Sequence, residues 1–199
     1  MILHMPSYTA TLVAATLLAS LLGGAILYDV RAHRIPNRLV LWGLVAALAL
    51  SAVAPHGGGY FSAGDAGSPG IGGSILGAAT GLAMFLPLYL LRAMGAGDVK
   101  LMAMTGAFLA PGGAAEAALL TLGLGGVLSL CVALWNGVLR HALANVRFML
   151  TDAAVRGLTA RAAAIEPALL SAGKVPYAIA IAAGTAAYVV MCTLRHNLF

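Results

Sequence analysis

The stretch RAMGAGDVKLMAMTGAFLAPGG, residues 92–113, decides how this chain folds. It is apolar except near its beginning, and it ends in a proline followed by two glycines. Counted from Val99 it offers only about 12 residues before Pro111, whereas a helix that crosses a lipid bilayer needs about 20. A spanning helix must therefore begin near Met94, which carries Asp98 into the membrane interface.

The composition of the chain indicates a membrane protein. Of the 199 residues, 61% are apolar and only 9% are charged, and the mean hydropathy is +0.97. These values lie far outside the range of soluble globular proteins. The first residues lack the features of a cleaved signal peptide, so we expect the first apolar run to remain as a span. The sequence predicts an all-α integral membrane protein with a single domain over residues 1–199.

Apolar runs of spanning length occur on both sides of this stretch. Together with the helix near residues 94–111 they predict about six transmembrane helices. The other five runs are Tyr8–Tyr28, Asn37–Ala54, Ile71–Leu91, Ala114–Leu139 and Val175–Leu194.

Loop charges orient these spans. Six spans place 10 of the 11 basic residues on one side and leave only Arg195 on the other. Because Lys and Arg concentrate in cytoplasmic loops, both termini should be periplasmic. The net charge of +5 then reflects topology and contact with an anionic inner leaflet, not nucleic acid. Residues Arg140–Lys174 predict a cytoplasmic amphipathic helix between spans 5 and 6.

Common metal and hydrolase motifs are missing from the sequence. Cys131 and Cys192 lie in apolar runs without a C-x-x-C pattern, which indicates buried packing residues. Neither H-E-x-x-H nor G-x-S-x-G occurs. We predict no metal and no cofactor.

Two carboxylates stand out on this topology. Asp29 ends the first span and Asp98 opens the fourth, so both lie at the cytoplasmic end of the bundle. One interpretation pairs each with a basic neighbour, Asp29 with Arg31 or Arg34 and Asp98 with Lys100. The other is a functional pair, because ionisable groups at membrane depth are costly and usually functional.

Two carboxylates brought together at a membrane surface can perform acid–base chemistry. Such a pair tends to share one proton. The ionised member can activate a water that attacks a peptide carbonyl, and the protonated member can polarise that carbonyl and protonate the amine. The sequence assigns neither role to a particular aspartate. Gly95 and Gly97 would allow a substrate strand or another helix to lie close beside Asp98.

Three motifs resemble a known family. They are YDVRAHRIPN at residues 28–37, GAGDVKL at 95–101 and KVPYAIAIAAG at 174–184. In this order they resemble the type IV prepilin peptidases, membrane aspartic proteases of the G-x-G-D type, over nearly the whole chain. The resemblance implies cleavage of a basic leader from prepilin or pseudopilin substrates at the cytoplasmic face of a bacterial inner membrane. Asp29 and Asp98 match the catalytic pair.

The remaining motif positions match residues that complete the motifs or position substrate. These positions are Gly95, Gly97, Lys100, Arg34, Pro36 and Asn37. Pro36 suits the start of a helix and Asn37 offers local capping, so a structural role for both is at least as well supported as substrate contact. Pro176 and Tyr177 are expected to position the last span.

The chain departs from the longer members of that family. Those members carry a cytoplasmic segment with paired C-x-x-C motifs and an amino-methyltransferase activity, and nothing here corresponds to it. Methylation of the processed pilin is therefore not expected. The short form resembles the peptidases of tight-adherence (Flp-type) pilus systems, which implies a small Flp-like substrate.

Two other classes of function use the same carboxylates. In a proton- or cation-coupled transporter, Asp29 and Asp98 would be ion ligands, which predicts discontinuous helices and a site near mid-membrane. In a non-catalytic assembly platform, both aspartates would be structural. Their expected location at one interface favours the peptidase.

Overall fold

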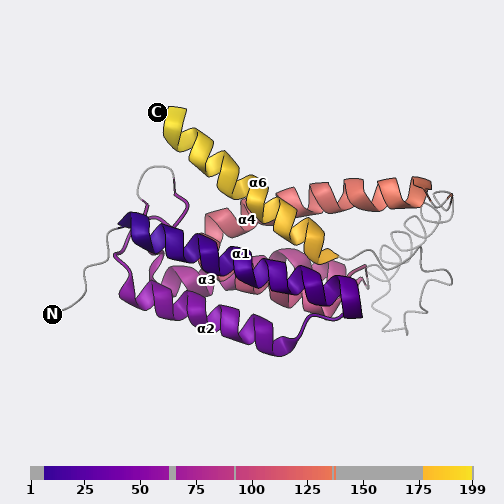
Figure 1. Ribbon diagram of the computed structural model, residues 1–199, viewed down its shortest axis with the longest axis horizontal. Coiled ribbons are helices and arrows are strands. Elements are labelled where there is room, and N and C mark those ends of the chain that lie inside the picture. Colours follow the sequence, from indigo (N-terminus) through magenta and orange to yellow (C-terminus); the bar gives the residue numbers. More distant parts are fainter. Residues whose placement is uncertain (1–6, 63–65, 92, 136, 138–176, 199) are drawn as a thin grey trace, which may run out of the picture. The chain divides into compact units, whose positions relative to one another are not determined.

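The computed structural model describes residues 7–62, 66–91, 93–135, 137 and 177–198. These ranges contain helices and no strand, which confirms the all-α class (Figure 1). The helices are α1 (Ser7–Ala32), α2 (Asn37–Val53), α3 (Gly70–Leu90), α4 (Ala96–Trp135) and α6 (Tyr177–Leu198).

Four of the described helices, α1, α3, α4 and α6, are long and apolar enough to cross a membrane. Helix α2 is also apolar but has only 17 residues. Helix α4 has 40 residues and contains most of the fourth and most of the fifth predicted run. The chain is thus a multi-pass helical protein, and six spans stay a prediction. The predicted amphipathic helix Arg140–Lys174 lies outside the described residues.

Helix α4 is interrupted at Ala110. The backbone there has φ 62° and ψ 170°, which is not helical. The sequence predicts two separate apolar runs here, one ending near Pro111 and the next beginning at Ala114. The structure places the break between two helical segments at Ala110, and the second segment begins directly at Pro111. Proline suits the first turn of a helix, since its fixed φ is helical and no N–H is required there.

Contacts along the chain define two compact units, one formed by Met1–Gly125 with Pro176–Phe199 and the other by Gly126–Val175. The first unit contains α1, α2, α3, most of α4 and α6, together with the site described below. A single domain over residues 1–199 stays a prediction.

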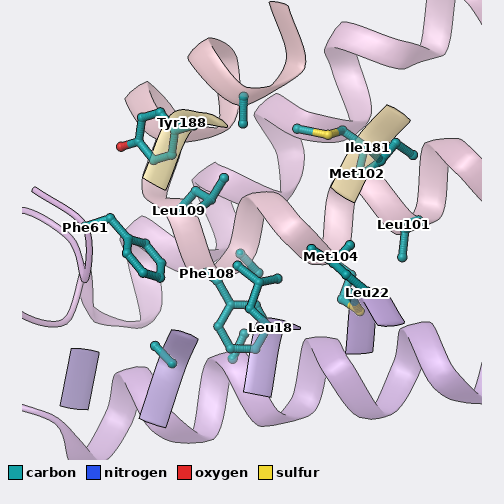
Figure 2. Packing of buried hydrophobic residues seen from close by; sticks show 14 of the residues in the cluster. Leu18, Leu22, Phe61, Leu101, Met102, Met104, Phe108, Leu109, Ile181 and Tyr188 are labelled. Carbon is teal, nitrogen blue, oxygen red and sulfur yellow. The ribbon is translucent and has the colours of Figure 1, made fainter. Parts of the chain in front are cut away.

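The first part of α4 is the centre of the first unit. Every residue from 101 to 110 is buried, including the large side chains of Met102, Met104 and Phe108. Figure 2 shows side chains of α4 directed toward α1, from which Leu18 and Leu22 point back. A helix surrounded in this way has little freedom to shift, so it holds its amino-terminal end in a fixed place.

Helices α3 and α4 approach each other through glycines. A Cβ added at Gly77 would overlap the carbonyl oxygen of Gly106, and one added at Gly106 would overlap that of Gly77. Gly81 has the same relation to Met102. Small residues at a helix interface let the two backbones come into contact, which is the main source of packing energy between helices in lipid.

The two cysteines differ in their surroundings. Cys192 is buried, as the sequence predicts, but Cys131 is exposed. The prediction for Cys131 is wrong because an apolar run does not indicate which face of a membrane helix is turned to lipid.

Candidate active site

One cavity of about 640 Å³ lies where the end of α1 meets the beginnings of α2 and α4. Its lining includes all eight residues selected from the sequence: Asp29, Arg34, Pro36, Asn37, Gly95, Gly97, Asp98 and Lys100. Tyr28, Ala32, His33, Ile35 and Ala96 complete the wall. The structure therefore brings the first two motifs together around one space.

Asp29 lies in the last turn of α1 and is only 8% exposed. Its Oδ2 accepts a hydrogen bond of 3.1 Å from the backbone N–H of Ala178, in the first turn of α6. The third motif thus reaches the site through its backbone. The sequence predicts only that Pro176 and Tyr177 position the last span.

Asp98 lies in the first turn of α4 and is tied to the residue that precedes this helix. The N–H of Gly95 donates to Asp98 Oδ2 at 3.2 Å, and the N–H of Asp98 donates to the Gly95 carbonyl oxygen at 3.2 Å. An acidic side chain that reaches back to the start of its own helix forms half of a capping box. This arrangement fixes the direction of the Asp98 side chain.

The two glycines of the G-x-G-D motif have different surroundings. A Cβ on Gly97 would lie 3.4 Å from Cβ of Ile35, in the connection between α1 and α2. Gly97 therefore lets this connection pack directly on the start of α4. Gly95 is exposed, and a Cβ there would lie 3.4 Å from Asp98 Oδ2. Of the two positions, Gly95 is the one left open beside the carboxylate.

In the part of the chain that the structure describes, the basic side chains do not pair with the two aspartates. Lys100 Nζ donates to Asn37 Oδ1 at 3.1 Å, which joins α4 to the start of α2. Among the described residues, neither Asp29 nor Asp98 takes part in an ion pair; Glu116 and Arg195 form one at 3.6 Å. The interpretation in which each aspartate is neutralised by a basic neighbour is wrong for this part of the chain.

Pro36 and Asn37 form the start of α2, but not by local capping. Pro36 is the N-cap residue with φ −63° and ψ 130°, and no side chain caps this helix. Asn37 is the first helical residue, and its side chain bonds to Lys100 instead. The expectation that Asn37 caps its own helix is therefore wrong, because a partner on α4 takes its oxygen.

Three contributors to the site escape sequence reasoning. His33 lines the cavity with a left-handed backbone, φ 47°, and its N–H donates to the Asp29 carbonyl oxygen at 2.9 Å. Tyr28, which is 50% exposed, precedes Asp29 on the same wall. Both lie within the motif YDVRAHRIPN, at positions that were not selected from the sequence, and membership of that motif was the available signal. Ala178 contributes a backbone N–H, which no residue type reveals.

A second cavity, of about 440 Å³, lies beside the interruption of α4. It is lined by residues 109–113, by Glu116 and Arg195, and by parts of the α2–α3 connection and α6. Glu116 is the one acidic residue in this lining. A transporter would require its discontinuous helix beside the two candidate ion ligands. Here the interruption at Ala110 adjoins the second cavity, and both aspartates line the first.

Comparison with known proteins identifies the family of this chain. Residues 16–134 match a model of the type IV leader peptidase family. The chain belongs to the type IV leader peptidase family. As a leader peptidase it carries both cavity aspartates inside the matched region, whereas α6 and Ala178 lie beyond it. No curated protein and no solved structure matches the chain.

Proposed function

We propose that this leader peptidase cleaves the bond between the basic leader and the hydrophobic segment of pilin-like precursors, with Asp29 and Asp98 as an aspartyl pair. The observation that carries this proposal is their placement in one cavity. Each uses Oδ2 to accept a backbone N–H. Within the described residues the hydrogen bonds of both aspartates use Oδ2, and we assign Oδ1 of each to water or substrate.

The chemistry follows from two carboxyl groups that hold one proton between them. The ionised carboxylate takes a proton from a water as the water oxygen attacks the peptide carbonyl carbon. The protonated carboxyl group donates a hydrogen bond to the carbonyl oxygen, which stabilises the negative charge that develops there. As the tetrahedral intermediate collapses and the C–N bond breaks, a carboxyl group gives its proton to the amine nitrogen.

The neighbouring motif residues support this pair in structural roles. The bond between Lys100 and Asn37 and the contact between Gly97 and Ile35 keep the α1–α2 connection against the start of α4. These contacts set the distance between the helices that carry the two aspartates. Arg34 is exposed at the cavity, where it is available to the polar part of a substrate.

The proposed setting is the inner membrane of a bacterium, with six spans, both termini in the periplasm and the cavity at the cytoplasmic face. The cavity end carries Arg31, Arg34, Arg38 and Lys100, in keeping with the concentration of basic residues on the cytoplasmic side. The proposed substrates are small Flp-like prepilins or pseudopilins, released without methylation.

Co-expression with a prepilin tests this function. We expect Asp29→Asn and Asp98→Asn each to remain in the membrane and to lower the rate of leader cleavage by roughly 100-fold or more, because acid–base catalysis is lost. Glu116→Gln removes a carboxylate that lines the second cavity and not the one with the two aspartates, so this variant should process the precursor normally. Mass spectrometry of the pilin amino terminus reports both the cleaved bond and any methyl group.

Two results would contradict the proposal. Cleavage at the normal rate by either aspartate variant would exclude the aspartyl pair. Normal cleavage combined with a loss of ion flux in proteoliposomes would favour the transporter.

A further inference from the structure

Asp29 lies at a position where its own helix provides no hydrogen-bond donor for a carboxylate. It lies in the last turn of α1, where unpaired carbonyl groups give the helix end a partial negative charge. It is also 92% buried, since its exposed fraction is 8%. A buried carboxylate requires hydrogen-bond donors. The donor must therefore come from another element.

The first turn of α6 supplies it. Ala178, which is fully buried, donates its N–H to Asp29 Oδ2 at 3.1 Å across 149 residues of sequence. The first N–H groups of a helix have no partner within the helix, and together they carry a partial positive charge. Asp29 thus caps α6 from another helix, and α6 fixes one oxygen of Asp29.

Aromatic packing keeps this turn in place. The ring of Tyr177 meets Phe85 of α3 edge to face, with centroids 6.4 Å apart and an interplanar angle of 75°. The Tyr177 hydroxyl also lies against Gly125 of α4, where an added Cβ would be 2.5 Å away. Because Tyr177 is fixed by two helices, the adjacent N–H of Ala178 has a defined position relative to Asp29.

We propose that the backbone N–H of Ala178, held by the first turn of α6, is a positioning group for the peptidase reaction. This inference rests on the proposed function of Asp29. The N–H holds Oδ2, so Oδ1 is directed to the reacting water or carbonyl group. Gly95 does the same for Asp98. Each aspartate then reacts through one oxygen while a backbone donor holds the other.

A pair of proline variants isolates the donor. Ala178→Pro removes the N–H that bonds to Asp29, and Ile179→Pro removes the next N–H of the same turn, which makes no such bond. Proline is tolerated in the first turn of a helix. We expect kcat for cleavage of a purified prepilin to fall roughly 10- to 100-fold in Ala178→Pro, the loss typical of a hydrogen bond to a charged group. KM should change little, and Ile179→Pro should resemble the unmodified enzyme.

A backbone ester provides a version of the test that does not alter the helix. Lactic acid incorporated at position 178 replaces the N–H by oxygen and keeps the methyl side chain. We expect the same fall in kcat with unchanged KM. An ester variant that retains normal kcat would overturn the positioning role. Equal losses of kcat in the two proline variants would then be explained by a change in the helix rather than by the missing N–H.

The two hypotheses fail in different ways. If Asp29→Asn is inactive and the ester variant is fully active, the aspartyl pair stands and the role of Ala178 is wrong. If Asp29→Asn cleaves normally, the proposed function itself is wrong, whatever the ester variant does.

Discussion

The contact between Gly77 and Gly106 holds α4 against α3, and a substitution at Gly77 tests this. In Gly77→Ala, the new Cβ would overlap the carbonyl oxygen of Gly106 and lie 3.0 Å from its carbonyl carbon. Carbon atoms in contact prefer a separation of about 3.5–4.0 Å, so α3 and α4 must move apart by roughly 0.5–1 Å. The obstacle is backbone, which cannot turn aside as a flexible side chain does.

The expected cost follows from two opposing terms. Overpacking of a well-packed contact costs about 1–3 kcal/mol. Replacement of a helical glycine by alanine returns up to about 1 kcal/mol through helix propensity. We therefore expect Gly77→Ala to lower the free energy of unfolding by up to about 2 kcal/mol. Because Asp98 opens the same helix as Gly106, a displacement near 1 Å can also slow cleavage by up to roughly 100-fold.

Thermal unfolding in detergent micelles and cleavage of a purified prepilin measure the two effects. Gly72→Ala is the matched control, since Gly72 lies on the same helix and an added Cβ there would meet no atom within 4 Å. This control should unfold at the same temperature or slightly higher and keep full activity. If Gly77→Ala behaves like Gly72→Ala in both assays, the close approach of α3 and α4 does not hold Asp98 in place.

Two further substitutions probe other parts of the first unit. Ala110→Gly should raise the free energy of unfolding by about 1 kcal/mol, because the observed φ of 62° and ψ of 170° suit only glycine. A lower midpoint of thermal unfolding would contradict this. A double-mutant cycle with Lys100→Met and Asn37→Ala should give a coupling free energy of about 0.5–1.5 kcal/mol for the 3.1 Å bond between them. A coupling of zero would mean that the bond does not join α4 to α2.

Run lengths and loop charges predicted much of the helical arrangement. The predicted run Asn37–Ala54 differs from α2 only by its last residue, and Ile71–Leu91 is shifted by one residue from α3. The same counting predicted that Asp29 and Asp98 lie at one end of the bundle, and the structure places both in one cavity. The thickness of the bilayer sets the length of an apolar run, and basic residues concentrate in cytoplasmic loops. Run lengths and the positions of Lys and Arg can both be read from the sequence.

The sequence did not reveal interactions that depend on tertiary contacts. The bond from Ala178 to Asp29 uses a backbone group that every residue except proline carries. Asn37 prefers Lys100 over its own helix because α4 packs beside it. The exact position of the interruption at Ala110 could not be predicted either, since proline and glycine occur in turns as well as in the first turn of a helix.

The helical segment between Gly95 and Ala110 has a fixed length because both of its ends are held in place. One end is tied by the bonds between Gly95 and Asp98, and the other by the change of backbone direction at Ala110. Each residue of a helix turns the next by about 100°. Insertion or deletion of one residue between Asp98 and Ala110 would therefore rotate the carboxylate out of the cavity or displace the interruption from its neighbours. The number of residues in this interval is as much a part of the site as their identity.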